Sequence, residues 1–211
     1  MKIALIGMSN SGKTYWAKKL EKKGFLRISC DDFIEERLKH ELDKFGYSRL
    51  NGISKWMGQP YESRYTENSC KYLKYEREAL QQIFEYLETE IADNQNIVID
   101  TTGSVIYTGE DMMKKLNRLT AVVLLDTPNL VLQEMFKSYI ENPKPVIWGE
   151  SFKKRNGESD EQALIRCYPQ LLSYRLKQYK KYAHIVLDYF LARESSFTMI
   201  DLLNLMKEQT Q

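Results

Sequence analysis

Short apolar runs alternate along the chain with longer segments in which apolar and polar positions mix. Five runs predict strands, at 2–6, 25–29, 96–100, 121–126 and 184–187. Most of them are continuously apolar, as in parallel strands covered on both faces. The segments between the runs have the length of crossover helices, so we expect repeated strand–helix–strand units with right-handed connections. The pattern predicts one α/β domain over 1–211, with three layers and a five-stranded parallel sheet.

Two segments are longer than this minimal pattern requires. The first, at about 31–94, predicts a glycine-rich loop, which contains Gly46, Gly52, Gly58 and Pro60. A long helix follows, with apolar positions at Leu73, Leu80, Ile83, Leu87 and Ile91. Their helical spacing indicates that these residues pack in the core.

The second long segment, at about 142–160, combines proline and glycine with a cluster of basic residues, Lys153-Lys154-Arg155. Proline and glycine at this density predict a mobile loop. Its place between the fourth and fifth strands is suited to a lid that closes over a ligand. A solvated basic loop is the alternative.

One motif gives the chain a chemistry. The residues after the first strand, Gly7-Met8-Ser9-Asn10-Ser11-Gly12-Lys13-Thr14, match the phosphate-binding pattern GxxxxGK[ST] at every fixed position. A helix is predicted directly after it, at 14–22. A strand, a glycine-rich turn and a helix start direct backbone N–H groups and the positive end of the helix dipole inward, which binds a polyphosphate. Lys13 then reaches the β- and γ-phosphates, and the Thr14 hydroxyl is a Mg²⁺ ligand. We expect ATP or GTP binding.

Composition and charge limit the partners and the cellular compartment that we expect for the protein. The formal net charge is only +2, which gives no electrostatic support for strong nucleic-acid binding. Cys30, Cys70 and Cys167 are few, odd in number and widely spaced, which favours a reducing compartment over a disulfide framework or a zinc site. No apolar run approaches the ~20 residues that span a bilayer, and the first strand leaves no room for a signal peptide. We expect a cytoplasmic monomer or weak dimer without membrane or nucleic-acid partners.

Three further segments are Ser29-Cys30-Asp31-Asp32-Phe33-Ile34-Glu35, Pro143-Lys144-Pro145-Val146-Ile147 and 174–183, the last with Arg175, Tyr179 and Ala183. In this order they resemble the D-x-D-x-x-I-E segment, the lid R-P-L-L and the R-x-x-x-Y-x-x-x-A segment of the shikimate kinases, a branch of the small P-loop kinases. Gly58 to Tyr61 with Glu76-Arg77-Glu78 loosely resembles the same family's GE-x-x-F-R-x-x-E. The resemblance implies a P-loop NTPase fold with a lid loop at about 142–160 and a helical insert, at about 31–94, that binds the phosphoryl acceptor.

The family's second aspartate in the acidic segment contacts the hydroxyl that attacks the γ-phosphate, and its late arginine binds the substrate carboxylate. The resemblance thus implies these roles for Asp31 and Arg175. The departures from the family pattern lie mostly on the acceptor side. Ser29 takes the place of the first aspartate, Thr101-Thr102-Gly103 takes the place of a glycine trio, and Arg77 is the nearest counterpart of a paired arginine. In the lid, Lys144 replaces the family's arginine, and Arg155 lies further along the same segment.

Two carboxylate positions compete for the metal. Asp100 ends the third apolar run, the position of a Walker-B acid, whereas Asp31 or Asp32 follows the second strand at the edge where ligands gather. We expect Asp31 to face the acceptor hydroxyl and Asp100 to face Mg²⁺, with water between. The alternative for Asp31 or Asp32 is to cap a helix that begins near Phe33.

The predicted function is that of an ATP-dependent phosphotransferase acting on a hydroxyl of a small polar metabolite. The site residues are Gly7, Ser9, Asn10, Ser11, Gly12, Lys13, Thr14, Lys144 and Arg155 for ATP; Asp31, Arg77, Thr102, Gly103 and Arg175 for the acceptor; Thr14 and Asp100 for Mg²⁺; with Lys13 and Asp31 catalytic. For Thr102 and Gly103, ordinary turn chemistry is the alternative. Other readings are a nucleoside or nucleotide kinase, a kinase of nucleic-acid ends, and an ATP-binding switch without transfer.

Overall fold

The structure, a computed structural model, describes residues 1–141 and 144–208. Within these residues five parallel strands form one sheet in the order β2-β3-β1-β4-β5. They are β1 (Lys2–Ile6), β2 (Leu26–Ser29), β3 (Ile97–Asp100), β4 (Ala121–Leu125) and β5 (Ile185–Leu187). The predicted five-stranded parallel sheet is confirmed, and each strand boundary agrees with the expected one to within a residue.

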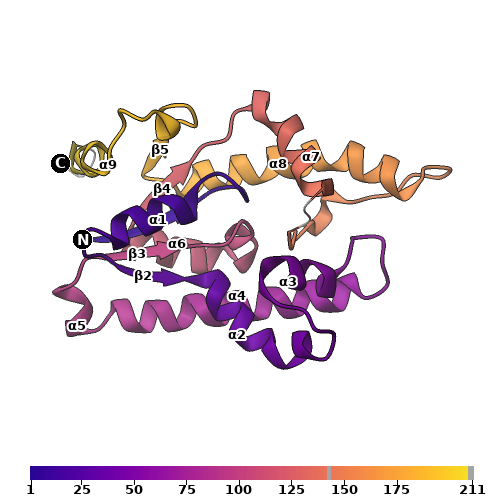
Figure 1. Ribbon diagram of the computed structural model, residues 1–211, viewed down its shortest axis with the longest axis horizontal. Coiled ribbons are helices and arrows are strands. Elements are labelled where there is room, and N and C mark those ends of the chain that lie inside the picture. The colour runs from indigo at the N-terminus through magenta and orange to yellow at the C-terminus, as the bar shows by residue number, and fades with distance from the viewer. Residues whose placement is uncertain (142–143, 209–211) are drawn as a thin grey trace.

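Helices fill the connections between the strands (Figure 1). The α-helices are α1 (Lys13–Glu21), α2 (Cys30–Asp43), α3 (Arg49–Met57), α4 (Tyr65–Leu87), α5 (Glu90–Asp93), α6 (Glu110–Leu119), α7 (Leu132–Glu141), α8 (Asp160–Tyr182) and α9 (Met199–Glu208). Four 3₁₀ turns among the described residues complete the chain: η1 (Val105–Thr108), η2 (Asn129–Val131), η3 (Gly149–Ser151) and η4 (Leu191–Arg193). None of the described helices is both long enough and apolar enough to cross a membrane.

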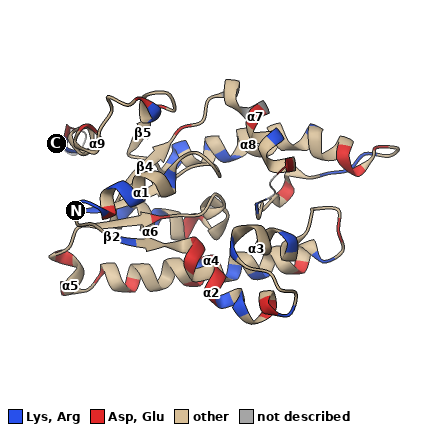
Figure 2. Ribbon diagram, in the orientation of Figure 1, with Lys and Arg blue, Asp and Glu red and all other residues tan. Residues whose placement is uncertain are grey.

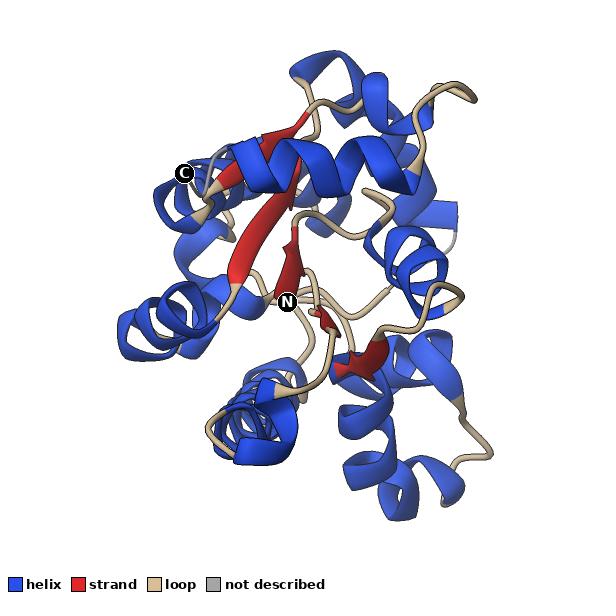
Figure 3. Ribbon diagram, turned by 90° about the vertical axis from the view of Figure 1, so that its left-hand side faces the viewer, coloured by secondary structure: helices blue, strands red, loops and turns tan. Residues whose placement is uncertain are grey.

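The sheet lies between two helical layers (Figure 3). Successive residues of a strand face opposite sides of a sheet, and β1 uses both faces. Ile3 and Leu5 belong to a core that α1 and α9 complete on one side. Ala4 and Ile6 belong to a larger core with α2, α4, α6 and α8 on the other. Because the strands are buried on both faces, they appear in the sequence as continuous apolar runs.

The insert at 31–94 differs from its prediction in two places. The expected loop contains a helix, α3, and Gly52 lies inside it. A Cβ on Gly52 would lie 3.0 Å from Tyr47 atoms, so close packing rather than a turn accounts for this glycine. The long helix α4 ends at Leu87, and Ile91, expected in the core, is 65% exposed on α5.

Charge of both signs is interspersed over the helices (Figure 2). The three cysteines are free, with Cys30 and Cys167 buried and Cys70 exposed.

The lid prediction at 142–160 falls partly on residues 142–143, which lie outside the described residues. Its remaining part runs from Lys144 through η3 to the start of α8.

Candidate active site

The phosphate-binding loop joins β1 directly to α1, as the motif predicts. Gly7 has φ +142°, and a Cβ there would lie 2.7 Å from the carbonyl oxygen of Leu125. Gly12 has φ +109° and immediately precedes α1. Only glycine adopts such angles freely, so the sequence allows the turn that brings the loop over the start of the helix. The first N–H groups of a helix have no intrahelical partner and can bind an anion there.

Lys13 is folded back on the loop. Its side-chain ammonium donates to the carbonyl oxygens of Gly7 at 2.9 Å and Met8 at 2.8 Å. Burial lowers the pKa of Lys13 to about 8, although Asp100 and Asp31 oppose the shift. Both hydrogen-bond partners of this buried cation are neutral carbonyls, and the two carboxylates compensate its charge only in part. A phosphate in the loop would supply the missing negative charge.

A cavity of about 70 Å³, the central pocket, opens beside this loop. Its lining includes the loop residues Ser9, Asn10, Lys13 and Thr14, together with Asp31, Leu50, Tyr72, Gly103, Ser104, Lys144 and Pro145. Phosphate-binding groups therefore share one cavity with a carboxylate from the second strand–helix junction. Parallel strands deliver such residues to one edge of the sheet, where ligands bind.

Asp31 enters the central pocket from the first turn of α2. The cap of this helix is Ser29, whose hydroxyl accepts from the backbone N–H of Asp32 at 3.2 Å. The alternative, in which Asp31 or Asp32 caps a helix that begins near Phe33, is therefore wrong, because the helix begins at Cys30. Burial raises the pKa of Asp31 to about 6 against the opposing charge of Lys13. The carboxyl group can thus take up a proton near neutral pH.

Asp100 ends β3 and is only 3% exposed. Its Oδ2 atom pairs with Arg27 at 2.9 Å, whereas its Oδ1 atom is buried without a hydrogen-bond partner. A buried carboxylate oxygen left open is suited to a metal-bound water. The described residues contain no cluster of three His, Cys, Asp or Glu side chains that could hold a metal alone. Thr14 and Asp100 therefore fit a Mg²⁺ ion that takes its other ligands from phosphate and water.

Glu76 is a site residue to which the sequence analysis assigned no role, although the stretch Glu76-Arg77-Glu78 contributed to the resemblance. It is fully buried on α4, where it accepts hydrogen bonds from the hydroxyls of Thr102 and, at 2.8 Å, Ser104. Burial raises the pKa of Glu76 to about 7, although these two hydrogen bonds oppose the shift. Thr102 is turned toward Glu76, while Gly103 and Ser104 line the central pocket. The signal in the sequence for this residue is an acidic side chain at a position where the helical spacing of α4 places buried residues.

Arg175 projects from α8 and is 3% exposed. One of its terminal nitrogens donates to the carbonyl oxygen of Gly103 at 2.9 Å and the other to that of Ile147 at 2.7 Å. The hydroxyl of Tyr179 also donates to Gly103, at 2.6 Å. The structure thus brings Arg175 next to the predicted acceptor loop, and both terminal nitrogens of its guanidinium are engaged by main-chain oxygens.

Arg77 lies elsewhere. It pairs with Asp111 at 3.1 Å and lines a groove beside α4 with Cys70, Lys74 and Tyr107. This groove shares no lining residue with the central pocket. The structure does not bring Arg77 together with Lys13 and Asp31.

The two predicted lid cations have different surroundings. Lys144 donates to the side chain of Asn10 at 2.5 Å and lines the central pocket. The following segment, 145–148, is fastened by Tyr65, whose hydroxyl donates to the carbonyl of Val146 at 3.0 Å and accepts from the N–H of Trp148 at 2.8 Å. Lys144 is therefore placed at the phosphate-binding loop by a well-anchored segment.

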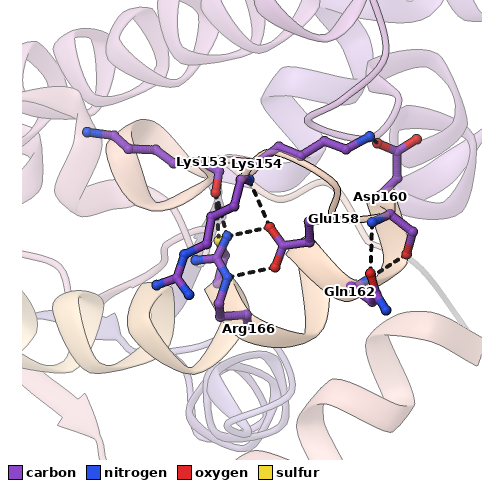
Figure 4. Close-up of polar contacts among 9 residues, drawn as sticks. Lys153, Lys154, Glu158, Asp160, Gln162 and Arg166 are labelled. Atoms are coloured by element: carbon purple, nitrogen blue, oxygen red, sulfur yellow. Dashed lines mark hydrogen bonds and ion pairs between the residues drawn. The ribbon is translucent and has the colours of Figure 1, made fainter.

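Arg155 belongs to the loop between η3 and α8. This loop lies at the end of α8 that is remote from the sheet (Figure 1). Its backbone N–H donates to Glu158 at 2.9 Å. Glu158 in turn pairs with Arg166 at 2.7 Å, and Lys154 pairs with Asp160 at 2.7 Å (Figure 4). Hydrogen bonds from Arg166 lower the pKa of Glu158 to about 2, so the pair stays ionised at neutral pH. The structure does not bring Arg155 to the phosphate-binding loop.

A further cavity, the outer pocket, lies beside the end of the loop and the start of α1 and has a volume of about 610 Å³. Tyr15 and Lys19 of α1 line it together with Arg193. The guanidinium of Arg193 lies 3.5 Å from the ring centre of Tyr189 and donates to the carbonyl of Ser11 at 3.1 Å. Sequence analysis missed this region, although the rule that ligands bind at the carboxyl ends of strands points to the segment after β5.

The comparisons with known proteins agree with this geometry. No protein-family model matches the chain, and no curated protein matches it. Solved structures do match over its whole length. Shikimate kinase from Aquifex aeolicus has a TM-score of 0.59 at 20% identity, covering 100% of this chain and 98% of that one. The chain has the fold of the shikimate kinases.

Two further matches support the same statement. Shikimate kinase from Bacteroides thetaiotaomicron has a TM-score of 0.58 at 19% identity and 99% coverage of that chain. Shikimate kinase from Acinetobacter baumannii, in complex with shikimate, has a TM-score of 0.54 at 18% identity and 90% coverage of that chain. Each covers 100% of the present chain. At these identities the likeness shows the shikimate-kinase fold alone, and the predicted resemblance is confirmed at that level.

Proposed function

We propose that the protein is an ATP-dependent phosphotransferase that moves the γ-phosphate to a hydroxyl of a small polar metabolite. The observation that supports this most directly is the shared lining of the central pocket, where Lys13 and Thr14 face the same cavity as Asp31. Phosphoryl transfer depends on positioning and charge neutralisation. A carboxylate next to the phosphate site adds a base for the incoming hydroxyl.

On this proposal the acceptor hydroxyl lies between Asp31 and the γ-phosphate. Its oxygen attacks the phosphorus, its proton passes to Asp31, and the bond from phosphorus to the β–γ bridging oxygen breaks, so that ADP leaves with the electron pair. A base works best with a pKa near the working pH, and the pKa of about 6 for Asp31 meets this condition.

ATP would occupy two parts of the site. The loop N–H groups, Lys13 and Lys144 bind the phosphates, and the outer pocket with Arg193 takes the base and sugar. Mg²⁺, when bound, neutralises charge on the phosphate oxygens, and the residues suited to hold it are Thr14 directly and Asp100 through water. The pair between Asp100 and Arg27 fixes the orientation of that carboxylate.

The test is ADP release from Mg²⁺·ATP, measured against a panel of shikimate, nucleosides, nucleoside monophosphates, sugars and a 5′-hydroxyl oligonucleotide. We expect one acceptor class to stimulate release and to yield a phosphorylated product. Lys13→Ala is the control, and we expect it to lose transfer by about three orders of magnitude or more while circular dichroism stays unchanged. If an acceptor still stimulates ADP release in Lys13→Ala, the assignment of the phosphate-binding loop is refuted. Tight ATP binding by the wild type with no transfer to any acceptor would favour an ATP-binding switch instead.

A further inference from the structure

Three buried side chains form a hydrogen-bonded cluster behind one wall of the central pocket. Glu76 on α4 is fully buried, and its two carboxyl oxygens accept from the hydroxyls of Thr102 and Ser104, the latter at 2.8 Å. The two hydroxyl oxygens lie 3.0 Å apart. Of these three residues, Ser104 is the one that lines the pocket. The cluster therefore determines what the Ser104 hydroxyl can offer to a ligand.

The hydrogen atoms of the cluster can be counted. When Glu76 is ionised, the two hydroxyl hydrogens are both donated to its carboxylate. Turning the Ser104 hydrogen into the pocket would leave a fully buried carboxylate oxygen without that donor. An unsatisfied buried acceptor costs more free energy than an ordinary hydrogen bond gains. The Ser104 oxygen therefore presents lone pairs, and no hydrogen, to the pocket.

The same result holds when Glu76 is protonated. Burial and the charge of Asp31 raise the pKa of Glu76 to about 7, against its hydrogen bonds and the charge of Arg175, so both forms occur near neutral pH. The protonated cluster has three hydrogens for its three oxygen–oxygen contacts. A closed ring uses all of them, whichever way round it runs. Ser104 then donates either to Thr102 or to Glu76, and its oxygen still faces the pocket with a lone pair.

We propose that Glu76 is a positioning residue that makes Ser104 a hydrogen-bond acceptor toward the central pocket, so that the second substrate carries, besides the hydroxyl that attacks ATP, a further hydroxyl or amino group that donates to Ser104. This inference rests on the proposed phosphotransferase function and specifies one contact of its substrate, whatever the net charge of that substrate. Asp31 receives the hydrogen of the attacking hydroxyl. An ether or carbonyl oxygen placed against Ser104 finds no donor there.

The test begins with a substrate found through labelling that depends on Lys13. The full-length protein is incubated with Mg²⁺, γ-³²P-labelled ATP and either the acceptor panel above or a deproteinised cell extract. The same incubations with Lys13→Ala show which products arise from contaminating kinases. No Lys13-dependent product from either source would refute the phosphotransferase function itself and with it the inference. A substrate whose phosphorylated hydroxyl is its single donor group would overturn the inference alone.

The substrate is then compared with analogues in which one other hydroxyl or amino group at a time is replaced by hydrogen or by a carbonyl oxygen. Hydrogen removes the whole interaction, whereas a carbonyl oxygen keeps lone pairs and removes the donor. We expect one position at which both replacements lower kcat/KM by about tenfold or more. If no position shows this loss, or if a carbonyl analogue is used as well as the parent at a position that Ser104→Ala affects, the inference is overturned while the phosphotransferase function stands.

Two variants assign that position to Ser104. Ser104→Ala removes the receiving oxygen, and we expect the analogue with hydrogen at this position to come within about threefold of the parent. Tyr72 also lines the pocket and interacts with Ser104, so Tyr72→Phe is the control, in which the preference for the parent should stay within about threefold of the wild-type value. A preference that survives in Ser104→Ala and disappears in Tyr72→Phe would assign the contact to Tyr72 and overturn the inference.

A matched pair of variants tests Glu76 itself. Glu76→Gln offers the cluster one oxygen and one N–H group, as a protonated glutamate does, and should keep the preference for the parent over its carbonyl analogue within about threefold. Glu76→Leu leaves Thr102 and Ser104 only each other, which frees one hydroxyl hydrogen, and this preference should fall by about tenfold. If Glu76→Leu keeps its fold by circular dichroism and lowers kcat/KM equally for both compounds, the role of Glu76 is structural and the inference is overturned. If Glu76→Leu does not fold, the Ser104→Ala and Tyr72→Phe comparisons decide.

Discussion

Replacing Asp31 with asparagine should stabilise the protein while it disables transfer. Asparagine has nearly the shape of a protonated aspartate, and the pKa of Asp31 rises from 3.8 to about 6 in the folded protein. A shift of about 2 units corresponds to about 3 kcal/mol at 1.36 kcal/mol per unit. This is an upper limit, because part of the side chain faces water in the central pocket.

The sign follows from proton binding. Between pH about 4 and 6 the folded protein still holds the proton that the unfolded chain has released, so the stability of the wild type falls as pH rises through this window. The variant has no such group. The difference in unfolding free energy, variant minus wild type, should therefore grow from about 1 kcal/mol at pH 4.5 to about 3 kcal/mol at pH 7.5.

Urea unfolding of both proteins at several pH values between 4.5 and 7.5 measures this difference. Asp32→Asn is the control, since Asp32 is the next residue and its side chain is 74% exposed; its effect should stay below about 1 kcal/mol at all pH values. A difference for Asp31→Asn that is constant with pH, or negative at pH 7.5, would refute the assignment of a burial-raised pKa. Transfer should fall by about 10²–10⁴-fold, the contribution of a general base.

Three further substitutions test other parts of the site. Arg27→Met leaves the buried Asp100 without its partner and should cost about 3–5 kcal/mol in unfolding free energy; a loss below about 1 kcal/mol would show that the pair is solvated. Arg193→Ala removes a charged hydrogen bond to the loop and should weaken ATP-analogue binding about tenfold by calorimetry, whereas unchanged affinity would exclude the outer pocket as the base site. Gly103→Ala places a Cβ 2.8 Å from the Ser9 hydroxyl and should raise KM for ATP, with wild-type KM as the contradicting result.

The sheet and the phosphate-binding loop could be predicted because local signals determine them. A strand buried on both faces needs a continuous apolar run, and the loop needs glycine at the positions whose backbone angles exclude other residues. Asp31 could be placed near the loop because strand ends in a parallel sheet meet at one edge, whereas Lys144 was indicated only by the resemblance of its segment to the family's lid.

The remaining features depend on packing contacts that no local sequence pattern indicates. Gly52 resembles a turn glycine in sequence, and only the approach of Tyr47 shows why a helix carries it. The position of Arg175 was indicated by the sequence, but its engagement by the carbonyl of Ile147 depends on a segment 28 residues away. Glu76 and Arg193 likewise acquire their surroundings from other elements, through Ser104 and Ser11.

The junction between β2 and α2 contains no spare residue, since Ser29 ends the strand and caps the helix. Each residue of an α-helix advances by about 100° around the axis, so one residue inserted or deleted between the cap and Asp31 would turn this carboxylate away from the central pocket. Homologous chains with a similar site can therefore vary in residue type at this junction but not in its length. The glycine-containing stretches around α3 and before α8 carry no such restriction, and differences in chain length between homologues should gather there.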